Sequence, residues 1–250
     1  MIRVCFTLDD GLKSQINFWN KTHVPSTYFI LPDATETVTN YGHKDLNILR
    51  WGYVRLLAKH NEIGFHGYSV KYEGWGTDKV IRIIKNQIEL FEHEVGYKPV
   101  SFAYTDMKST CLPLIDPQFP YIRDYFWRDK DKDGNYNLRI PETPVRFKSY
   151  IPKIWCCHPV SDVVVLLKYI KKLKHKGYEY VVIILHEVTD EIIQLGKIIG
   201  NAYDTVTFRQ IFEGQSSDTG GNPQPATVNK TAAEAGSTPA ASPNESEGKC

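Results

Sequence analysis

Short apolar runs recur along the first 212 residues of the chain, and each has the length of a buried β-strand. The first run extends from Ile2 to Phe6, and the most apolar one begins at Tyr180 and closes on His186 and Glu187. The predicted strands cover residues 2–6, 26–31, 62–66, 100–104, 121–127 and 180–187.

Segments of helical periodicity separate these runs. The clearest helix is predicted over residues 78–95, where apolar residues share one stripe and where Gly96 and Pro99 end the pattern. A second helix over residues 163–174 ends in a basic turn, which suits the negative end of a helix dipole. Further helices are predicted over residues 12–21 and 51–60, and a last short strand and helix over residues 204–212.

The alternation of strands and helices predicts the fold class. Such a pattern favours an α/β protein in which a mostly parallel sheet carries a helical outer layer. About seven strand–helix units indicate an irregular or incomplete (β/α) barrel, and we assign it to a single domain at residues 1–213. In a barrel of this kind the catalytic residues lie at the C-terminal ends of the strands.

The composition changes abruptly after the last predicted helix. Residues 214–250 consist mainly of Ser, Thr, Ala, Pro, Gly, Asn and Glu, with almost no large apolar side chain. Such a segment cannot bury enough surface to offset the entropy of ordering it. We therefore predict a disordered C-terminal tail.

The overall composition fits a globular protein and excludes several kinds of partner. Of the 250 residues, 42% are hydrophobic, and the formal net charge of +1 gives no electrostatic basis for binding nucleic acid or an anionic membrane. No run approaches the roughly 20 apolar residues of a membrane span, and no signal peptide is seen. The expected location is the cytoplasm, or outside the cell if the given sequence is truncated.

The cysteines do not predict a disulfide framework or a metal cluster. Their number, five, is odd and their spacing is irregular. Cys156, Cys157 and His158 are adjacent, but no second cysteine-rich pair accompanies them. We interpret these residues as packing residues of the core or of a loop.

Polar residues at the ends of the predicted strands provide the candidate chemistry. Asp9 and Asp10 follow the first strand, where adjacent carboxylates raise one another's pKa unless a metal, hydrogen bonds or a shared proton offsets the repulsion. A turn at Gly11 or a helix cap is the alternative interpretation. His66 and His186 end two other strands, and imidazole and carboxylate groups together form zinc-like sites and acid–base pairs.

These residues stand in motifs that resemble those of the polysaccharide deacetylases, the NodB-homology domains of carbohydrate esterase family 4. The resemblance covers about residues 2–212. Residues 7–11, Thr-Leu-Asp-Asp-Gly, resemble the first family motif, Thr-Phe-Asp-Asp-Gly, and residues 184–187, Ile-Leu-His-Glu, resemble the last, Leu-Leu-His-Asp. Residues 62–69 and 102–107 stand where the motifs His-Ser/Thr-x-x-His and Arg-Pro-Pro-Tyr-Gly are expected.

The resemblance implies a metal-dependent hydrolase that removes N-acetyl groups from an N-acetylated carbohydrate. Asp9 would be the general base, and His186 the general acid that protonates the departing amine. Asp10 and His66 would ligate a divalent metal, usually zinc, with cobalt or nickel as alternatives. A backbone N–H near Asp106 would help the metal to stabilise the oxyanion.

The chain departs from the family motifs at three positions. Val70 stands in place of the second metal-ligating histidine, Ala103 in place of an arginine that orients the base, and Asp106 in place of a tyrosine. The loss of one of three protein ligands should weaken metal binding by orders of magnitude unless another ligand replaces it. The candidates for that ligand are Asp106, His158 and additional water.

The expected partner is a carbohydrate, and two other functions stay open. Tyr68 and Tyr104 would offer aromatic surfaces for sugar rings, or would pack beneath loops. The first alternative function is a hydrolase of a small amide with weak or no metal dependence. The second is a catalytically inactive carbohydrate-binding domain, against which the presence of all four strand-end residues argues.

Overall fold

Seven parallel strands form one sheet in the computed structural model, which describes residues 2–32, 48–67, 75–104, 116–123, 154–157 and 163–213. The order of the strands across the sheet is β5-β4-β3-β2-β1-β7-β6. The strands are β1 (Arg3–Leu8), β2 (Ser26–Ile30), β3 (Glu62–His66), β4 (Ser101–Ala103), β5 (Tyr121–Arg123), β6 (Ile154–Cys157) and β7 (Tyr180–Leu185).

Helices lie in most of the connections that the structure describes, because parallel pairing needs a crossover between strands. The described α-helices are α1 (Ile16–Thr22), α2 (Trp51–Leu57), α3 (Thr77–Val95), α5 (Val163–His175), α6 (Asp190–Ala202) and α7 (Phe208–Glu213), and the described 3-10 helices are η1 (Lys13–Gln15) and η3 (Asp116–Gln118).

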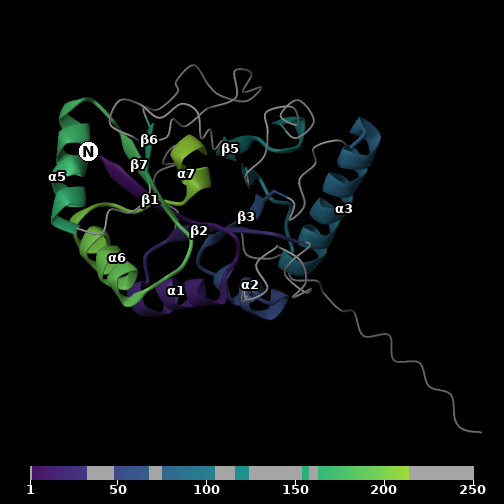
Figure 1. Ribbon diagram of the computed structural model, residues 1–250, viewed down its shortest axis with the longest axis horizontal. Helices are drawn as coiled ribbons and strands as arrows, with labels where there is room; N and C mark the ends of the chain where they lie inside the picture. The colour runs from purple at the N-terminus through teal and green to yellow at the C-terminus, as the bar shows by residue number, and fades with distance from the viewer. Residues whose placement is uncertain are drawn as a thin grey trace, which may run out of the picture.

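The sheet is curled, with helices along its outside and one helix on its inside. Helices α5, α6, α1, α2 and α3 follow the outer face in an arc, while α7 lies within the arc (Figure 1). Among the described strands, β5 and β6 each pair on one side only, so these strands do not close a barrel. The predicted incomplete (β/α) barrel is therefore confirmed.

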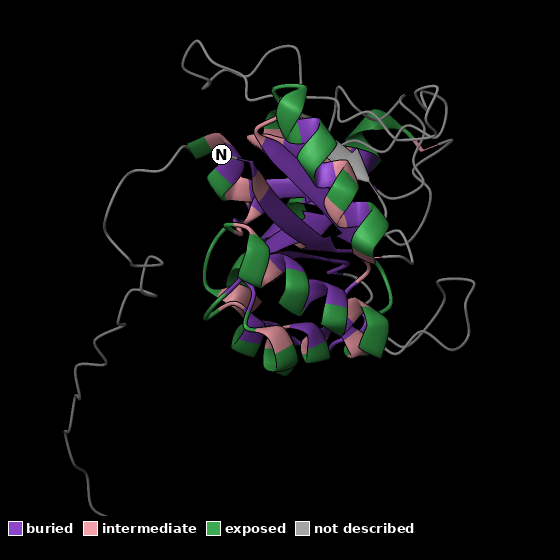
Figure 2. Cartoon of the chain, turned by 90° about the vertical axis from the view of Figure 1, so that its left-hand side faces the viewer, coloured by how far each residue is buried: buried purple, intermediate pink, exposed green. Residues whose placement is uncertain are grey.

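The two faces of the sheet bury two separate apolar clusters. Along β1, Val4, Phe6 and Leu8 enter the larger cluster beneath the outer helices, whereas Cys5 enters a smaller cluster that includes Phe208 of α7. This division follows from the alternation of side chains along a strand. Figure 2 shows the result: the described strands are buried along most of their length, whereas the helices are buried where they face the sheet.

Most predicted elements agree with the structure, and two elements are additions. The pattern predicts neither α6 nor the short strand β6, whose residues include Cys156 and Cys157. In the last predicted unit, Thr205 makes a bridge with Val4 and α7 follows. The tail predicted to be disordered lies outside the described residues.

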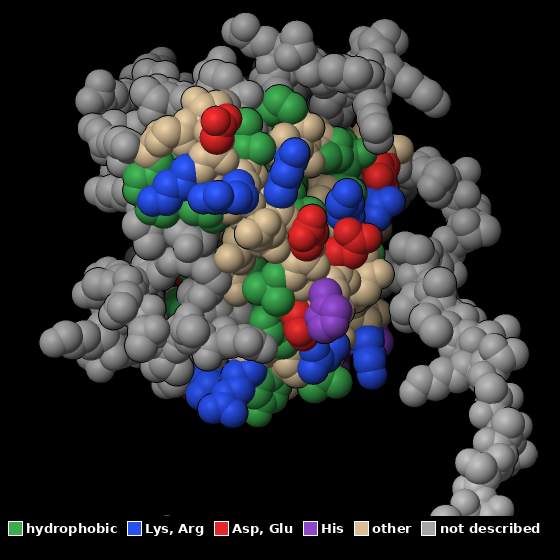
Figure 3. Space-filling model, turned by 90° about the vertical axis from the view of Figure 1, so that its right-hand side faces the viewer, with side chains coloured by type: hydrophobic (Ala, Val, Ile, Leu, Met, Phe, Trp, Pro, Cys, Tyr) green, Lys and Arg blue, Asp and Glu red, His purple; other side chains and the backbone are tan. Residues whose placement is uncertain are grey.

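None of the described helices is long and apolar enough to cross a membrane. On the side of the molecule that carries α3, acidic and basic side chains are interspersed (Figure 3). Such a mixture of charges is typical of a face exposed to water.

Candidate active site

The two aspartates lie where β1 ends and the chain turns sharply. The Asp9 N–H donates to the carbonyl oxygen of Leu185 at 2.8 Å, so the ladder with β7 holds this residue in place. Asp10 and Gly11 then adopt left-handed backbone angles, with φ of 72° and 64°. Gly11 is needed for close packing as well, because a Cβ there would lie 3.3 Å from Cγ2 of Ile30. The backbone therefore leaves β1 directly after Asp9, which is buried, and presents Asp10, whose side chain is 24% exposed.

His66, the last residue of β3, points one ring nitrogen at this carboxylate pair. Its Nδ1 lies 2.9 Å from the carbonyl oxygen of Ala103, which can only accept a hydrogen bond, so Nδ1 carries a proton. Its Nε2 lies 3.2 Å from Oδ1 of Asp10 and 3.9 Å from Oδ2 of Asp9. This arrangement is typical of metal-binding histidines, in which a backbone acceptor fixes one nitrogen and the other faces the ion.

The charges of these three residues act on one another. Burial alone would raise the pKa of Asp10, but the hydrogen bond with His66 and nearby positive charges, including that of His186, outweigh it and lower this pKa. Burial would likewise lower the pKa of His66, yet the charge of Asp9 and the contact with Asp10 raise it. A divalent ion bound to the same atoms would compete with a proton for Nε2 of His66.

Arg123, at the end of β5, holds Asp9 in an ion pair that the sequence does not predict. Its Nη2 lies 2.5 Å from Oδ2 of Asp9, and its Nη1 donates to Oγ1 of Thr7 at 3.0 Å. The guanidinium carbon also lies 5.0 Å from the centre of the Phe29 ring, and the side chain is only 1% exposed. The family resemblance places an arginine at position 103, on β4, whereas in this chain the arginine beside Asp9 comes from the neighbouring strand β5. An arginine that closes the apolar pair Tyr121–Ile122 was the available signal in the sequence.

Gln15, in η1, is a second residue of the site that the sequence does not predict. Its side chain is fully buried, and its Nε2 donates to the backbone oxygens of both Asp9 and His186. It therefore connects the ends of β1 and β7, where the two candidate proton-transfer residues lie.

Of the other predicted site residues, the structure describes His186 and Tyr104. His186 follows β7 and is exposed, near enough to Asp10 for its charge to act on that carboxylate. Tyr104 is buried, with its ring centre 4.8 Å from that of Phe102, which favours a packing role over contact with a sugar. Four residues with predicted or considered roles lie outside the described residues: Tyr68, Val70, Asp106 and His158.

The described donors fit a zinc-like ion as two of its ligands. A tetrahedral ion with bonds of about 2.1 Å would hold its ligand atoms about 3.4 Å apart. Nε2 of His66 and Oδ1 of Asp10 are 3.2 Å apart, and their types are those that such ions prefer. Within the described part of the chain, no third histidine, cysteine or carboxylate completes a group of three.

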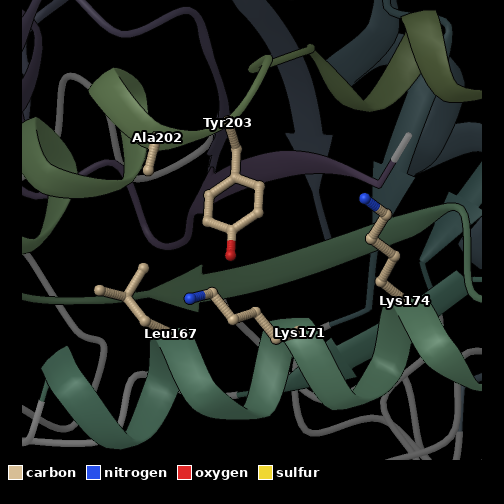
Figure 4. Close-up of a pocket in the computed structure, with 5 residues that line it drawn as sticks. All are labelled: Leu167, Lys171, Lys174, Ala202 and Tyr203. Atoms are coloured by element: carbon tan, nitrogen blue, oxygen red, sulfur yellow. The ribbon is translucent and has the colours of Figure 1, made fainter.

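A separate pocket of about 330 Å³ lies on the outer layer, between α5 and the end of α6. Leu167, Lys171 and Lys174 line it from α5, and Ala202 and Tyr203 from the other side (Figure 4). None of the candidate catalytic residues lines this pocket.

Comparison with known proteins identifies the fold through structure alone. No protein-family model and no curated protein matches the sequence. A protein from Mycobacterium smegmatis assigned as a polysaccharide deacetylase is similar, with a TM-score of 0.53 and 16% identity over 85% of this chain and 89% of that one. The Xyl-CE4 domain of a multidomain xylanase from the hindgut metagenome of Trinervitermes trinervoides has a TM-score of 0.50 and 14% identity over 85% of this chain and 91% of that one.

A third similar structure is a mutant of a CE4 family pseudoenzyme from Bacillus anthracis. Its TM-score is 0.50, with 12% identity over 84% of this chain and 67% of that one. At these identities the comparisons establish the fold. The chain therefore has the fold of the CE4 polysaccharide deacetylases, which confirms the family resemblance of its sequence at the level of the fold.

Proposed function

We propose that the protein is a metal-dependent hydrolase that removes N-acetyl groups from an N-acetylated carbohydrate. One observation carries the proposal: the ring nitrogen of His66 that faces the site lies 3.2 Å from Asp10, while Asp9 lies beside them in an ion pair with Arg123. The named activities of proteins with this fold are consistent with the chemistry of these residues. The name of the similar protein from Mycobacterium smegmatis, a polysaccharide deacetylase, supports a carbohydrate substrate, and the N-acetyl group is what the sequence motifs imply.

Asp10 and His66 would hold the divalent ion, with zinc expected and cobalt or nickel as alternatives. When bound, such an ion activates water for attack and polarises the carbonyl group of the acetamide. The described residues do not supply a third ligand. Asp106, His158 and additional water remain the candidates for it.

Asp9 would act as the general base. Its Oδ2 accepts the hydrogen bond from Arg123, whereas its buried Oδ1 has no hydrogen-bond partner among the described residues. A buried carboxylate oxygen without a donor is available to take a proton from water. The ion pair with Arg123 keeps the carboxylate group from turning and balances its charge.

His186 would act as the general acid. It lies across the β1–β7 pair from Asp9, at the next position after Leu185, and its side chain is exposed to an approaching substrate. A protonated imidazole there would give its proton to the departing amine. Base and acid then come from the ends of two adjacent strands, β1 and β7.

A catalytically inactive carbohydrate-binding domain is the second candidate function. It is favoured by a single observation, namely that the described residues supply two metal ligands and not three. Such a domain would keep the fold without catalysing the reaction.

Metal analysis combined with acetate release from N-acetylglucosamine oligomers tests the proposal. We expect a bound divalent ion and an activity that falls by about 10²- to 10⁴-fold in Asp9→Asn. Asp78→Asn, which changes an exposed aspartate in the first turn of α3, is the matched control and should retain full activity. Protein that binds no ion and releases no acetate would overturn the proposal.

A further inference from the structure

The 3-10 helix η1 contacts the segment after β7 at two points, the backbone of His186 and that of Val188. Gln15 donates from Nε2 to the backbone oxygen of His186 at 2.8 Å, and Oγ of Ser14 accepts from the N–H of Val188 at 3.2 Å. Gln15 also donates to the backbone oxygen of Asp9. We call Ser14 and Gln15 the η1 clamp.

His186 lies past the end of the sheet ladder, where such contacts have the most effect. The register between β1 and β7 ends at Leu8 and Leu185, and α6 begins only after its N-cap, Thr189. Residues 186 and 187 between these elements are exposed. The η1 clamp therefore holds a short exposed connection that neither the strand nor the helix includes.

The buried amide of Gln15 has its hydrogen bonds directed at the backbone of Asp9 and His186. Glutamine is mostly an exposed residue, yet this side chain is 0% exposed. Both acceptors of its Nε2 are backbone oxygens at strand ends, and its Oε1 has no partner among the described residues. An unsatisfied buried oxygen destabilises the fold, so an apolar residue of the same size would suit packing alone at least as well.

We propose that Gln15, assisted by Ser14, is a positioning residue that fixes His186 relative to Asp9 for proton transfer to the departing amine. The inference rests on the proposed function, because the role of His186 as the acid belongs to it. The clamp itself touches backbone atoms, so it acts through the placement of His186 and not on the substrate.

The expected effect of removing the clamp is on the rate and not on binding. A misplacement of about 1 Å at a reacting group can lower a rate about 100-fold. Gln15→Met keeps the size of the side chain and removes its donors. We expect kcat to fall by about ten- to a hundredfold, with KM changed less than threefold. Ser14→Ala should have the same effect to a smaller degree.

Asn61, the residue before β3, provides a matched control at the opposite ends of the strands, where they begin. Its buried amide also joins two backbone groups, accepting from the N–H of Ser26 and donating to the oxygen of Leu57, both at 3.1 Å. Asn61→Leu should lower stability without lowering kcat. A loss of kcat as large in Asn61→Leu as in Gln15→Met would show that general destabilisation causes it, and would overturn the proposal.

A double-mutant cycle with His186→Ala decides whether Gln15 acts through His186. If it does, adding Gln15→Met to His186→Ala changes kcat less than twofold. If the two losses multiply, Gln15 acts elsewhere, and the proposal is wrong.

NMR on the intact protein separates the failure of this inference from the failure of the proposed function. The clamp predicts that Gln15→Met, and not Asn61→Leu, increases the motion of the His186 ring, and that Ser14→Ala speeds hydrogen exchange at the Val188 N–H. An inactive protein with these changes would overturn the proposed hydrolase and leave the positioning of His186 supported. Unchanged ring motion and exchange would overturn the clamp whether or not the protein is active.

Discussion

Arg123 and Asp9 form a buried ion pair whose members come from opposite parts of the chain, 114 positions apart. Removing one member of such a pair leaves an uncompensated charge in the interior, which costs about 3–5 kcal/mol. We therefore expect Arg123→Met to lower the free energy of unfolding at neutral pH by about that amount. Urea unfolding measures it, and adding Asp9→Asn should recover part of the loss. Losses that simply add in the double variant would contradict the pairing.

Glu62, the first residue of β3, gives a second prediction at the scale of one side chain. Burial raises the pKa of its carboxyl group above the usual 4.5, although the Arg209 N–H and the hydroxyls of Ser101 and Thr27 donate to it. The folded protein then holds this proton at pH values where the unfolded chain has released it. Its contribution to stability is full below about pH 4.5 and is lost as the pH rises through the raised value.

The variant Glu62→Gln removes this titration and keeps the shape of the side chain. Relative to the wild type, it should gain stability as the pH rises above about 4.5. Urea unfolding of both proteins between acidic and neutral pH tests this expectation. A difference in stability that stays constant over that range would contradict it.

The sequence predicts the site residues that follow apolar strands. It misses the residues that reach the site from distant positions in the sequence. Asp9, Asp10 and His66 each follow an apolar run, so the common edge of a parallel sheet brings them together. Arg123 lies 114 positions from Asp9, and Gln15 lies 171 positions from His186, and no local pattern encodes such contacts. Those two residues required the structure.

At the scale of elements, the contact between α1 and α6 depends on a glycine. A Cβ on Gly196 would lie 2.7 Å from the ring of Phe18 and 3.1 Å from Cγ2 of Thr22, closer than packed atoms allow. Gly196→Ala should therefore destabilise the protein by about 1–3 kcal/mol. Gly52→Ala is the control, because a Cβ there meets nothing within 4 Å, and it should stabilise α2 by up to about 1 kcal/mol. Thermal unfolding of both variants measures the contrast, and equal stability would show that α1 and α6 can separate to fit the methyl group.

The same glycine explains why the sequence pattern does not reveal α6. Gly196 and Gly200 lie inside the helix and weaken its intrinsic propensity, although Ile193, Leu195 and Ile199 are buried. Helix α3 lacks interior glycine and has a regular apolar stripe, so its bounds differ from the prediction by one residue, at Thr77. Periodicity thus predicts helices whose propensity agrees with their packing, and misses those in which close packing requires glycine.

At the scale of the whole molecule, a metal ion would join β1 to β3 through Asp10 and His66 and should stabilise the entire fold. An ion that binds only the folded state adds about 2.7 kcal/mol at a concentration of 100 times its Kd. We expect Zn²⁺ or Co²⁺ to raise the unfolding temperature, and a chelator to reverse the rise. His66→Ala and Asp10→Asn should each abolish it, because each removes a donor of the 3.2 Å pair. The exposed His93, on α3, provides the control His93→Ala, which should respond as the wild type does. An equal rise of the unfolding temperature in His66→Ala would show that the ion binds elsewhere. In the wild type, the side chains of His66 and Asp10 would then contact each other without an ion between them.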